Sequence, residues 1–315
     1  MNGNEEGGDE MMEKPLRGII PIAAAPFTST GKLDEDSFQQ MVRHLVETGI
    51  HGITLFGLAT EFYKLTDEEK KVMQHLLLSE TCTHPTVAGV ISITDHAAET
   101  ALWRALEAEA QGADALMVLP PFFLQPGEAA IITYIRTIAC KVTLPIIVQY
   151  APNQTGVRFS PDVFLRLCEE CPNIRFIKVE TQPPGRYVSQ LIAGSKGKLG
   201  AFVGYAGVQM PDVLDRGAVG IQPGCSLSEV YVRLFHLYES GKRGAFDTLS
   251  RELLPYISYW MQGVELIIRA EKVMLQRRGI IASDHCREPH YTLDALEVQM
   301  IDHCLEWFQH EFYQH

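Results

Sequence analysis

Residues 175–180 read Arg-Phe-Ile-Lys-Val-Glu, an apolar run that ends in alternating apolar and charged residues. This alternation is typical of a β-strand, whose successive side chains point to opposite faces. Lys178 and Glu180 then share one face, and Ile177 and Val179 share the other. Two charged side chains on one face of an otherwise apolar strand are the first candidates for chemistry.

Seven similar apolar stretches accompany this one and alternate with longer amphipathic segments. The predicted strands are Gly18–Ala23, Gly52–Phe56, Thr86–Ile91, Ala115–Leu119, Pro145–Gln149, Arg175–Glu180, Gly200–Val203 and Ala218–Gln222, and the predicted helices between them include Asp36–Thr48, Asp67–Thr81, Asp95–Gln111, Glu128–Lys141, Pro161–Glu170 and Ser226–Glu239. This alternation indicates parallel strands with crossover helices. Eight units over residues 18–240, at about 28 residues each, predict a (β/α)₈ TIM barrel. A doubly wound sheet is the competing architecture, but no predicted strand is followed by its Gly-x-Gly-x-x-Gly turn.

The two ends of the chain differ from this repeating region. Residues 1–17 begin with an acidic, glycine-rich stretch that lacks the basic and apolar order of a signal peptide, so we expect a flexible tail. Residues 241–315 carry no strand pattern and contain helical stretches around Phe246–Arg278 and Leu293–Phe312. We therefore expect the barrel at residues 18–240 and a helical extension packed on it at 241–315.

Composition excludes several classes of function. The 315 residues include 27 Lys and Arg against 39 Asp and Glu, and a net charge of -12 opposes binding to nucleic acid. No apolar run reaches the roughly 20 residues that cross a membrane. Seven cysteines, an odd number without regular spacing, indicate a reducing, cytoplasmic environment.

The metal-binding patterns in the chain are incomplete. Cys168 and Cys171 have the spacing of a zinc or redox pair, but no second Cys or His pair accompanies them. The 11 histidines form no His-x-His or His-Glu-x-x-His arrangement. We therefore expect a reaction without metal or cofactor.

Lys178 and Glu180 allow a specific chemistry if the fold is a barrel, because the carboxyl ends of barrel strands face the active site. Burial there would keep part of the lysine as free amine, the form that attacks a carbonyl to make a Schiff base. Glu180 beside it could move protons. The residues also allow a second interpretation, an ion pair at the barrel rim.

Several motifs occur in an order that resembles a known family. Residues 25–27 read Ala-Pro-Phe and are followed by Gly-Lys-Leu-Asp at 31–34; Gly-Leu-Ala-Thr-Glu stands at 57–61, with Leu-Thr at 65–66. Residues 149–156 read Gln-Tyr-Ala-Pro-Asn-Gln-Thr-Gly. Their order and spacing resemble the dihydrodipicolinate synthase/N-acetylneuraminate lyase family. The resemblance implies a Schiff-base barrel with its lysine at Lys178, a small 2-oxo acid as substrate, and a homo-oligomer, either a dimer or a tetramer.

The departures from the family pattern are also informative. The fifth-strand tyrosine that moves a proton in the family's aldolases is replaced by Gln149. Two further members of the proton relay of the dihydrodipicolinate synthases match Leu58 and Phe123, and the arginine that holds the semialdehyde carboxylate matches Gln154. An amide cannot replace that arginine electrostatically, which argues against dihydrodipicolinate synthesis.

One branch of the family shares these departures. Residues 148–152, Val-Gln-Tyr-Ala-Pro, residues 176–181, Phe-Ile-Lys-Val-Glu-Thr, and residues 279–283, Gly-Ile-Ile-Ala-Ser, resemble the 2-keto-3-deoxy-sugar-acid dehydratases, especially the L-2-keto-3-deoxyarabonate dehydratases. Dehydration needs a base for the C3 proton and an acid for the departing C4 hydroxyl, and one carboxylate beside the imine can do both. We therefore predict a lyase in which Lys178 binds the C2 carbonyl and Glu180 moves the protons.

The same resemblance implies the substrate-binding residues. Ala59 and Thr60 match the loop that holds the substrate carboxylate, and Gln149, Gly204 and Gln222 match positions that line the pocket. Thr60 could instead cap a helix, and Gly204 could serve a tight turn.

Three alternative functions remain open from the sequence. The first is a class I pyruvate-type aldolase, similar to N-acetylneuraminate lyase or 4-hydroxy-2-oxoglutarate aldolase, in which Tyr150 replaces the missing tyrosine. The second is a dihydrodipicolinate synthase-like enzyme. The third is an oxo-acid-binding regulatory barrel without catalysis, against which the retained Lys178 and Glu180 argue.

Overall fold

The protein, seen here in a computed structural model that describes residues 14–313, is built around eight parallel strands. They are β1 (Gly18–Ile19), β2 (Gly52–Leu55), β3 (Ala88–Ile93), β4 (Ala115–Val118), β5 (Ile146–Tyr150), β6 (Ile174–Val179), β7 (Gly200–Val203) and β8 (Gly220–Ile221). The strands lie in the order β1-β8-β7-β6-β5-β4-β3-β2. The segment after β1 closes the ring onto β2, because the backbone N–H of Ala23 donates to the Thr54 carbonyl at 2.9 Å. The predicted (β/α)₈ barrel is confirmed.

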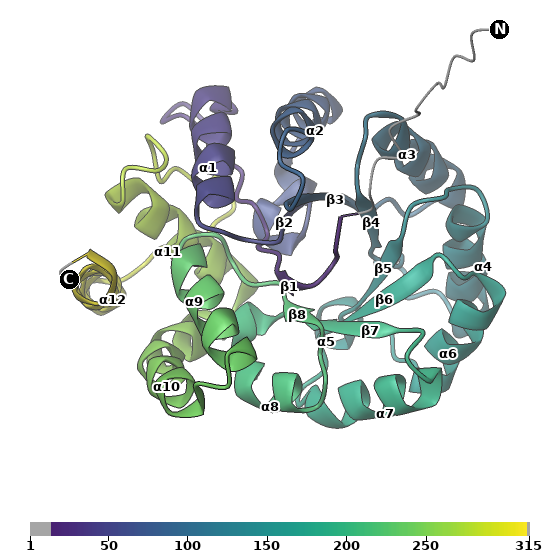
Figure 1. The fold of residues 1–315 in the computed structure, drawn as a ribbon. Coiled ribbons are helices and arrows are strands. Elements are labelled where there is room, and N and C mark those ends of the chain that lie inside the picture. The colour runs from purple at the N-terminus through teal and green to yellow at the C-terminus, as the bar shows by residue number, and fades with distance from the viewer. Residues whose placement is uncertain (1–13, 314–315) are drawn as a thin grey trace, which may run out of the picture.

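Helices surround the strands on the outside (Figure 1). They are α1 (Glu35–Glu47), α2 (Asp67–Thr81), α3 (Ala98–Ala110), α4 (Glu128–Ala139), α6 (Pro161–Glu170), α7 (Gly185–Ser195), α8 (Met210–Asp215) and α9 (Ser228–Glu239), and shorter turns lie at η1 (Leu58–Thr60), η2 (Phe62–Lys64), α5 (Pro152–Thr155) and η3 (Tyr205–Gly207). Side-chain caps fix the start of two helices: Asp34 caps α1, and Thr66 forms a capping box with Glu69 at α2.

Several element boundaries differ from those predicted. β3 begins two residues later than predicted, and α7 and α8 lie outside the predicted helices. Helix α3 begins at Ala98 and not at Asp95, which lies in the preceding loop and whose carbonyl accepts a hydrogen bond from the Tyr134 hydroxyl at 2.6 Å.

The barrel interior changes from apolar to polar along the strands. Ile20, Val90, Met117, Ile147, Phe176 and Phe202 pack together in the lower part of the barrel. Further along the same face lie Lys178 of β6 and Glu180 just past its end, whereas Ile177 and Val179 belong to the core shared with the helices. The two faces predicted for this strand are therefore confirmed, and the polar end of the barrel is the carboxyl end of the strands.

Three longer helices follow the barrel: α10 (Arg243–Trp260), α11 (Val264–Arg277) and α12 (Ala295–Tyr313). The stretch predicted around Phe246–Arg278 is thus two helices, which are separated at Gly263. In α12, Phe308 belongs to the core, and Trp307 and Phe312 pack against it. Within residues 14–313, no helix is long and apolar enough to cross a membrane.

Candidate active site

Lys178 and Glu180 meet in a cavity at the carboxyl end of the barrel. The Lys178 ammonium nitrogen Nζ lies 3.4 Å from Glu180 Oε1, and both side chains are buried. The cavity is lined by residues at the ends of several strands, in the loops that follow them and in the helices after the barrel. Besides Lys178 and Glu180, these residues are Ile22, Leu58, Ala59, Gln149, Gln154, Tyr205, Ala206, Gln222, Pro223, Gly224, Met261, Val264 and Ile267. The arrangement places an amine nucleophile and a carboxylate side by side, shielded from bulk water.

Two residues fix the Glu180 carboxylate in this position. Gln149, which is paired with Lys178 across β5 and β6, donates a hydrogen bond from Nε2 to Glu180 Oε2 at 2.7 Å. Gly204 lies against the other oxygen, and a Cβ at this position would come within 2.1 Å of Glu180 Oε1. The φ of Gly204 is −94°, so a tight turn does not explain this glycine. Room for the carboxylate does.

The loop after β2 contributes unevenly to the cavity. Ala59 lines the cavity, but both hydrogen-bond donors of Thr60 are already used. Its hydroxyl donates to the Ala23 carbonyl at 2.6 Å, and its backbone N–H donates to the Gly57 carbonyl at 3.0 Å. Thr60 is not a helix cap either, since that role at α2 belongs to Thr66. In this structure Thr60 ties the loop to the segment after β1.

Two amide groups present unpaired oxygen atoms at the cavity. Gln222 donates from Nε2 to the Thr54 hydroxyl oxygen at 3.1 Å, and its carbonyl oxygen Oε1 is buried without a described partner. Gln154 donates from Nε2 to the Tyr205 hydroxyl oxygen at 3.0 Å, and its Oε1 is also left without one. A buried acceptor without a partner carries a free-energy cost, so a ligand with hydroxyl donors would be favoured here.

Tyr150 does not reach the cavity. Its hydroxyl donates to the Phe159 carbonyl and accepts from the Phe159 N–H, both at 2.9 Å. Its ring stacks on Tyr187 with centroids 4.9 Å apart. Tyr150 is thus part of the packing between the barrel and its outer helices, and it does not stand in for the missing family tyrosine.

Tyr205 is a lining residue that sequence reasoning missed. It follows Gly204 at the end of β7 and sits in η3, with its hydroxyl close to Asn153 and Gln154 of α5. No local signal marks it, since a tyrosine after an apolar strand is common. Only the conformation of this loop brings the side chain to Lys178 and Glu180.

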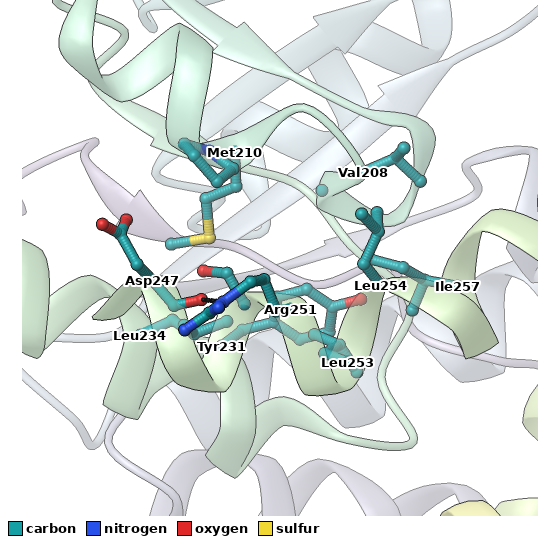
Figure 2. A pocket seen from close by; sticks show the side chains of 12 residues that line it. Val208, Met210, Tyr231, Leu234, Asp247, Arg251, Leu253, Leu254 and Ile257 are labelled. Atoms are coloured by element: carbon teal, nitrogen blue, oxygen red, sulfur yellow. Dashed lines mark hydrogen bonds between the residues drawn. The ribbon is translucent and has the colours of Figure 1, made fainter. Parts of the chain in front are cut away.

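A second cavity, of about 520 Å³, lies on the other side of η3. Figure 2 shows Asp247 at one end and Val208, Leu254 and Ile257 at the other. Its charged groups are engaged: Asp247 accepts from Arg243 at 2.8 Å, and Arg251 donates to the Asp247 backbone carbonyl. Among its described lining residues this cavity has no lysine, whereas the cavity at Lys178 holds an amine beside a carboxylate.

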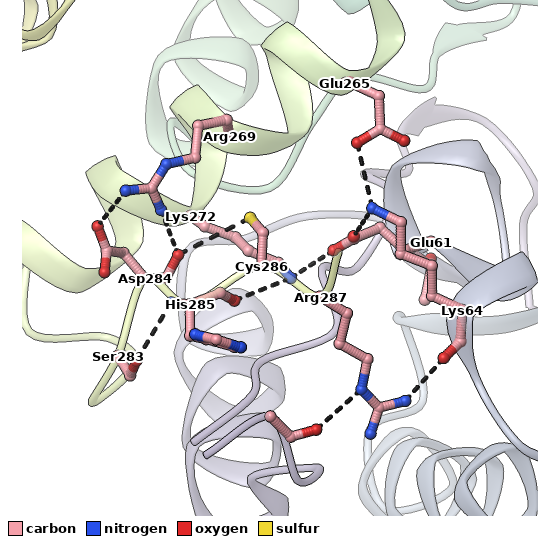
Figure 3. A network of polar contacts seen from close by, with 12 residues as sticks. Glu61, Lys64, Glu265, Arg269, Lys272, Ser283, Asp284, His285, Cys286 and Arg287 are labelled. Atoms are coloured by element: carbon pink, nitrogen blue, oxygen red, sulfur yellow. Dashed lines mark hydrogen bonds and ion pairs between the residues drawn. The ribbon is translucent and has the colours of Figure 1, made fainter. Parts of the chain in front are cut away.

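A buried ion-pair network anchors the loop after β2 to α11 (Figure 3). Glu61 is fully buried and pairs with both Lys272 of α11 and Lys64, the latter at 2.9 Å. Burial alone would lower the pKa of Lys64, but its pairs with Glu61 and Glu265 outweigh burial and raise that pKa. Glu61 is thus structural, and it holds the loop that carries Leu58 and Ala59.

Replacing Glu61 with glutamine is expected to lower the free energy of unfolding by about 3–5 kcal/mol, because it leaves buried Lys272 without a carboxylate. Urea denaturation measures this loss as a lower midpoint concentration, provided that the slope of the unfolding free energy against urea concentration is the same for both proteins. Glu169→Gln, the same change at an exposed position of α6, is the control and should change stability by less than about 0.5 kcal/mol. A loss below about 1 kcal/mol for Glu61→Gln would contradict the structural role.

Metal-binding clusters are missing from the part of the chain that the structure describes: residues 14–313 contain no group of three or more His, Cys, Asp or Glu side chains that could hold an ion. Cys171 lies 4.0 Å from Cys140, on the neighbouring helix end, and this pair has no third ligand.

Comparisons with known proteins agree with this fold. Residues 15–306 match the Dihydrodipicolinate synthetase family. The L-2-keto-3-deoxyarabonate dehydratase of Azospirillum brasilense is 24% identical over 277 residues, which are 87% of this chain and 88% of the relative. The 4-hydroxy-tetrahydrodipicolinate synthase of Campylobacter fetus subsp. fetus is 27% identical over 210 residues, which are 67% of this chain and 69% of the relative.

Solved structures share the fold at lower identity. The crystal structure of dihydrodipicolinate synthase from Rhodopseudomonas palustris has a TM-score of 0.85 at 23% identity, over 92% of this chain and 97% of that one. The 4-hydroxy-tetrahydrodipicolinate synthase of Methylacidiphilum fumariolicum has a TM-score of 0.84 at 23% identity, over 94% of this chain and 97% of that one. These two structures bear on the barrel architecture alone.

Proposed function

Because the chain belongs to the dihydrodipicolinate synthetase family of lyases, we propose that it dehydrates a 2-keto-3-deoxy sugar acid through a Schiff base on Lys178. The observation that carries this proposal is the 3.4 Å contact between Lys178 Nζ and Glu180 Oε1. Glu180 is the one carboxylate among the described residues that line the cavity. A single carboxylate beside the imine suits an elimination, in which one group first removes and then returns a proton.

The reaction follows from these positions. The free amine of Lys178 attacks the C2 carbonyl and expels water to form an iminium ion. Glu180 removes a C3 proton, and the electron pair of the C3–H bond forms the C2–C3 double bond of an enamine. That pair then forms the C3–C4 double bond as the C4–O bond breaks, and the proton on Glu180 leaves with the hydroxide as water. Hydrolysis of the new iminium ion frees Lys178, and tautomerisation of the product gives a semialdehyde.

The same geometry disfavours the alternative reactions. Retro-aldol cleavage requires a base at the C4 hydroxyl, which in the family's aldolases is the tyrosine replaced here by Gln149. Tyr150 could act in its place only from within the cavity, but its hydroxyl is hydrogen-bonded to the Phe159 backbone outside the cavity. Dihydrodipicolinate synthesis requires a group that holds a second carboxylate, and Gln154 is neutral. Within the described lining, Lys178 is the one cationic side chain.

The unpaired amide oxygens support a hydroxylated substrate. Gln222 and Gln154 offer acceptors that the hydroxyl groups of a sugar acid would satisfy. The similarity to an L-2-keto-3-deoxyarabonate dehydratase over most of both chains supports the same substrate class. L-2-keto-3-deoxyarabonate is therefore the first substrate to test.

We also propose that the enzyme works as a homo-oligomer in the cytoplasm. An exposed apolar group formed by Tyr63, Phe123 and Leu124 supports self-association, since Phe123 and Leu124 are 80% and 85% exposed. All seven cysteines are free, which supports a reducing compartment. Phe123 supplies no proton, so a partner subunit would cover this surface without joining the chemistry through it.

The direct test is to incubate the enzyme with L-2-keto-3-deoxyarabonate and follow the products by NMR. Dehydration gives a 2,5-dioxo acid, whereas retro-aldol cleavage gives pyruvate and glycolaldehyde. The first outcome is expected. The second would replace the dehydratase with an aldolase, and no product with any of several 2-keto-3-deoxy sugar acids would contradict the proposed function.

A further inference from the structure

The loop after β7 holds Tyr205 in an unusual backbone conformation. Tyr205 and Ala206 have φ values of +51° and +47°, in the left-handed region that non-glycine residues rarely occupy. Two consecutive residues of this kind are strained, and such strain persists where the surrounding structure enforces it, often at functional sites. The result here is that Tyr205 and Ala206 both line the cavity that contains Lys178 and Glu180.

Two hydrogen bonds hold this loop in place. From outside the loop, the hydroxyl of Tyr231, which lines the second cavity shown in Figure 2, donates to the Ala206 carbonyl at 2.7 Å. Within the loop, the Gly207 N–H donates to the Gly204 carbonyl at 3.1 Å. The backbone that carries Tyr205 is therefore fixed relative to Gly204, which lies against the Glu180 carboxylate.

The hydrogen bonds of the Tyr205 hydroxyl leave its proton unused. Its oxygen accepts from Asn153 Nδ2 at 3.3 Å and from Gln154 Nε2 at 3.0 Å. Both partners are amide nitrogens, which donate and do not accept. Within residues 14–313, no acceptor for the phenolic proton accompanies them, and the side chain is only 7% exposed. A buried hydroxyl that accepts twice and donates to no described group is oriented to donate to a ligand.

From this arrangement we infer that Tyr205 donates a hydrogen bond to the C4 hydroxyl oxygen of the substrate, the oxygen that leaves as water. This inference rests on the proposed dehydration. As the C4–O bond breaks, negative charge develops on that oxygen, and a fixed donor stabilises it more than the neutral hydroxyl of the ground state. Glu180 still supplies the proton that completes the water, so Tyr205 keeps its own proton throughout.

Asn153 and Gln154 would act through Tyr205 as positioning residues. Each donates to the phenolic oxygen, which polarises the O–H bond and turns its proton away from α5. The Gln154 position, where relatives use an arginine for a carboxylate, thus serves here to orient a donor for a hydroxyl. The replacement of that arginine by Gln154 would therefore favour a 2-oxo acid with a hydroxyl at C4 as the substrate.

The test compares wild type with Tyr205→Phe on L-2-keto-3-deoxyarabonate and on its analogue with chlorine in place of the C4 hydroxyl. Loss of the donor is expected to lower kcat for the hydroxyl substrate about 10²-fold. Chloride departs without a proton and accepts hydrogen bonds much more weakly than a departing hydroxide, so its release should fall less than about tenfold in the variant. Trapping of the pyruvate imine with borohydride should be unchanged.

Tyr187→Phe is the matched control, because it also removes one tyrosine hydrogen bond, to the Phe159 carbonyl on the outer side of the barrel. Its kcat should stay near that of wild type. Equal losses on both substrates would assign Tyr205 a purely structural role, and an unchanged kcat on the hydroxyl substrate would remove Tyr205 from the reaction. Failure of the proposed function is a separate result, since wild type itself would then release no water from the hydroxyl substrate.

Discussion

Replacing Lys178 with alanine is expected to abolish turnover and to remove the borohydride-trapped adduct with pyruvate. The cavity offers no substitute, because Lys178 is the one amine among its described lining residues. In other enzymes, removal of the covalent nucleophile lowers kcat by about 10⁴-fold or more, and we expect an effect of the same size here. Intact-mass measurement after borohydride reduction should show one added pyruvate on wild type and none on the variant.

The variant requires a folding control, because Lys178 is buried against Glu180. Circular dichroism and the thermal midpoint of Lys178→Ala should be compared with those of Lys198→Ala, which changes an exposed lysine near the end of α7. Lys198→Ala should keep both the adduct and the turnover. An adduct that persists in folded Lys178→Ala would place the Schiff base on another amine and overturn the mechanism.

The sequence was sufficient to predict the barrel because its signal is repeated eight times. Each apolar strand has a length and a β-branched content that a helix would not share, and the spacing allows a helix between strands. Boundaries were less accurate where contacts between elements decide them. Asp95, for example, lies in the loop before α3, where its carbonyl accepts from the Tyr134 hydroxyl, 39 positions away.

The candidate site was predictable as far as strand alternation reaches. Lys178, on β6, and Glu180, just past its end, share a face because they are two residues apart in extended chain, and this much follows from the sequence alone. Gln149 reaches Glu180 because β5 pairs with β6 in register, which the sequence does not specify. Thr60 and Tyr205 illustrate the limit, since their roles depend on loop conformation and on which hydrogen bonds are already made.

Glu180→Gln is expected to separate imine formation from the proton transfers that follow. Glutamine has nearly the size of glutamate and can still accept from Gln149, so Lys178 should keep its surroundings and form the pyruvate adduct. It cannot remove a C3 proton at neutral pH. Loss of a general base costs typically 10²–10⁴ in rate, and here one group is proposed to act both as base and as acid, so kcat should fall by about 10⁴.

Exchange of the pyruvate methyl protons in D₂O isolates the first of these two proton transfers. The exchange requires the iminium ion and then removal of a C3 proton, but it involves no C4 hydroxyl. In wild type the methyl signal should disappear from the NMR spectrum, and in Glu180→Gln it should persist although borohydride still traps the adduct. Glu169→Gln, on the surface of α6, should exchange as wild type does.

If Glu180→Gln exchanged the methyl protons at the wild-type rate yet failed to dehydrate the sugar acid, another group would be the C3 base. Glu180 would then act only on the leaving hydroxyl, where its position beside Gly204 and the Tyr205 loop places it.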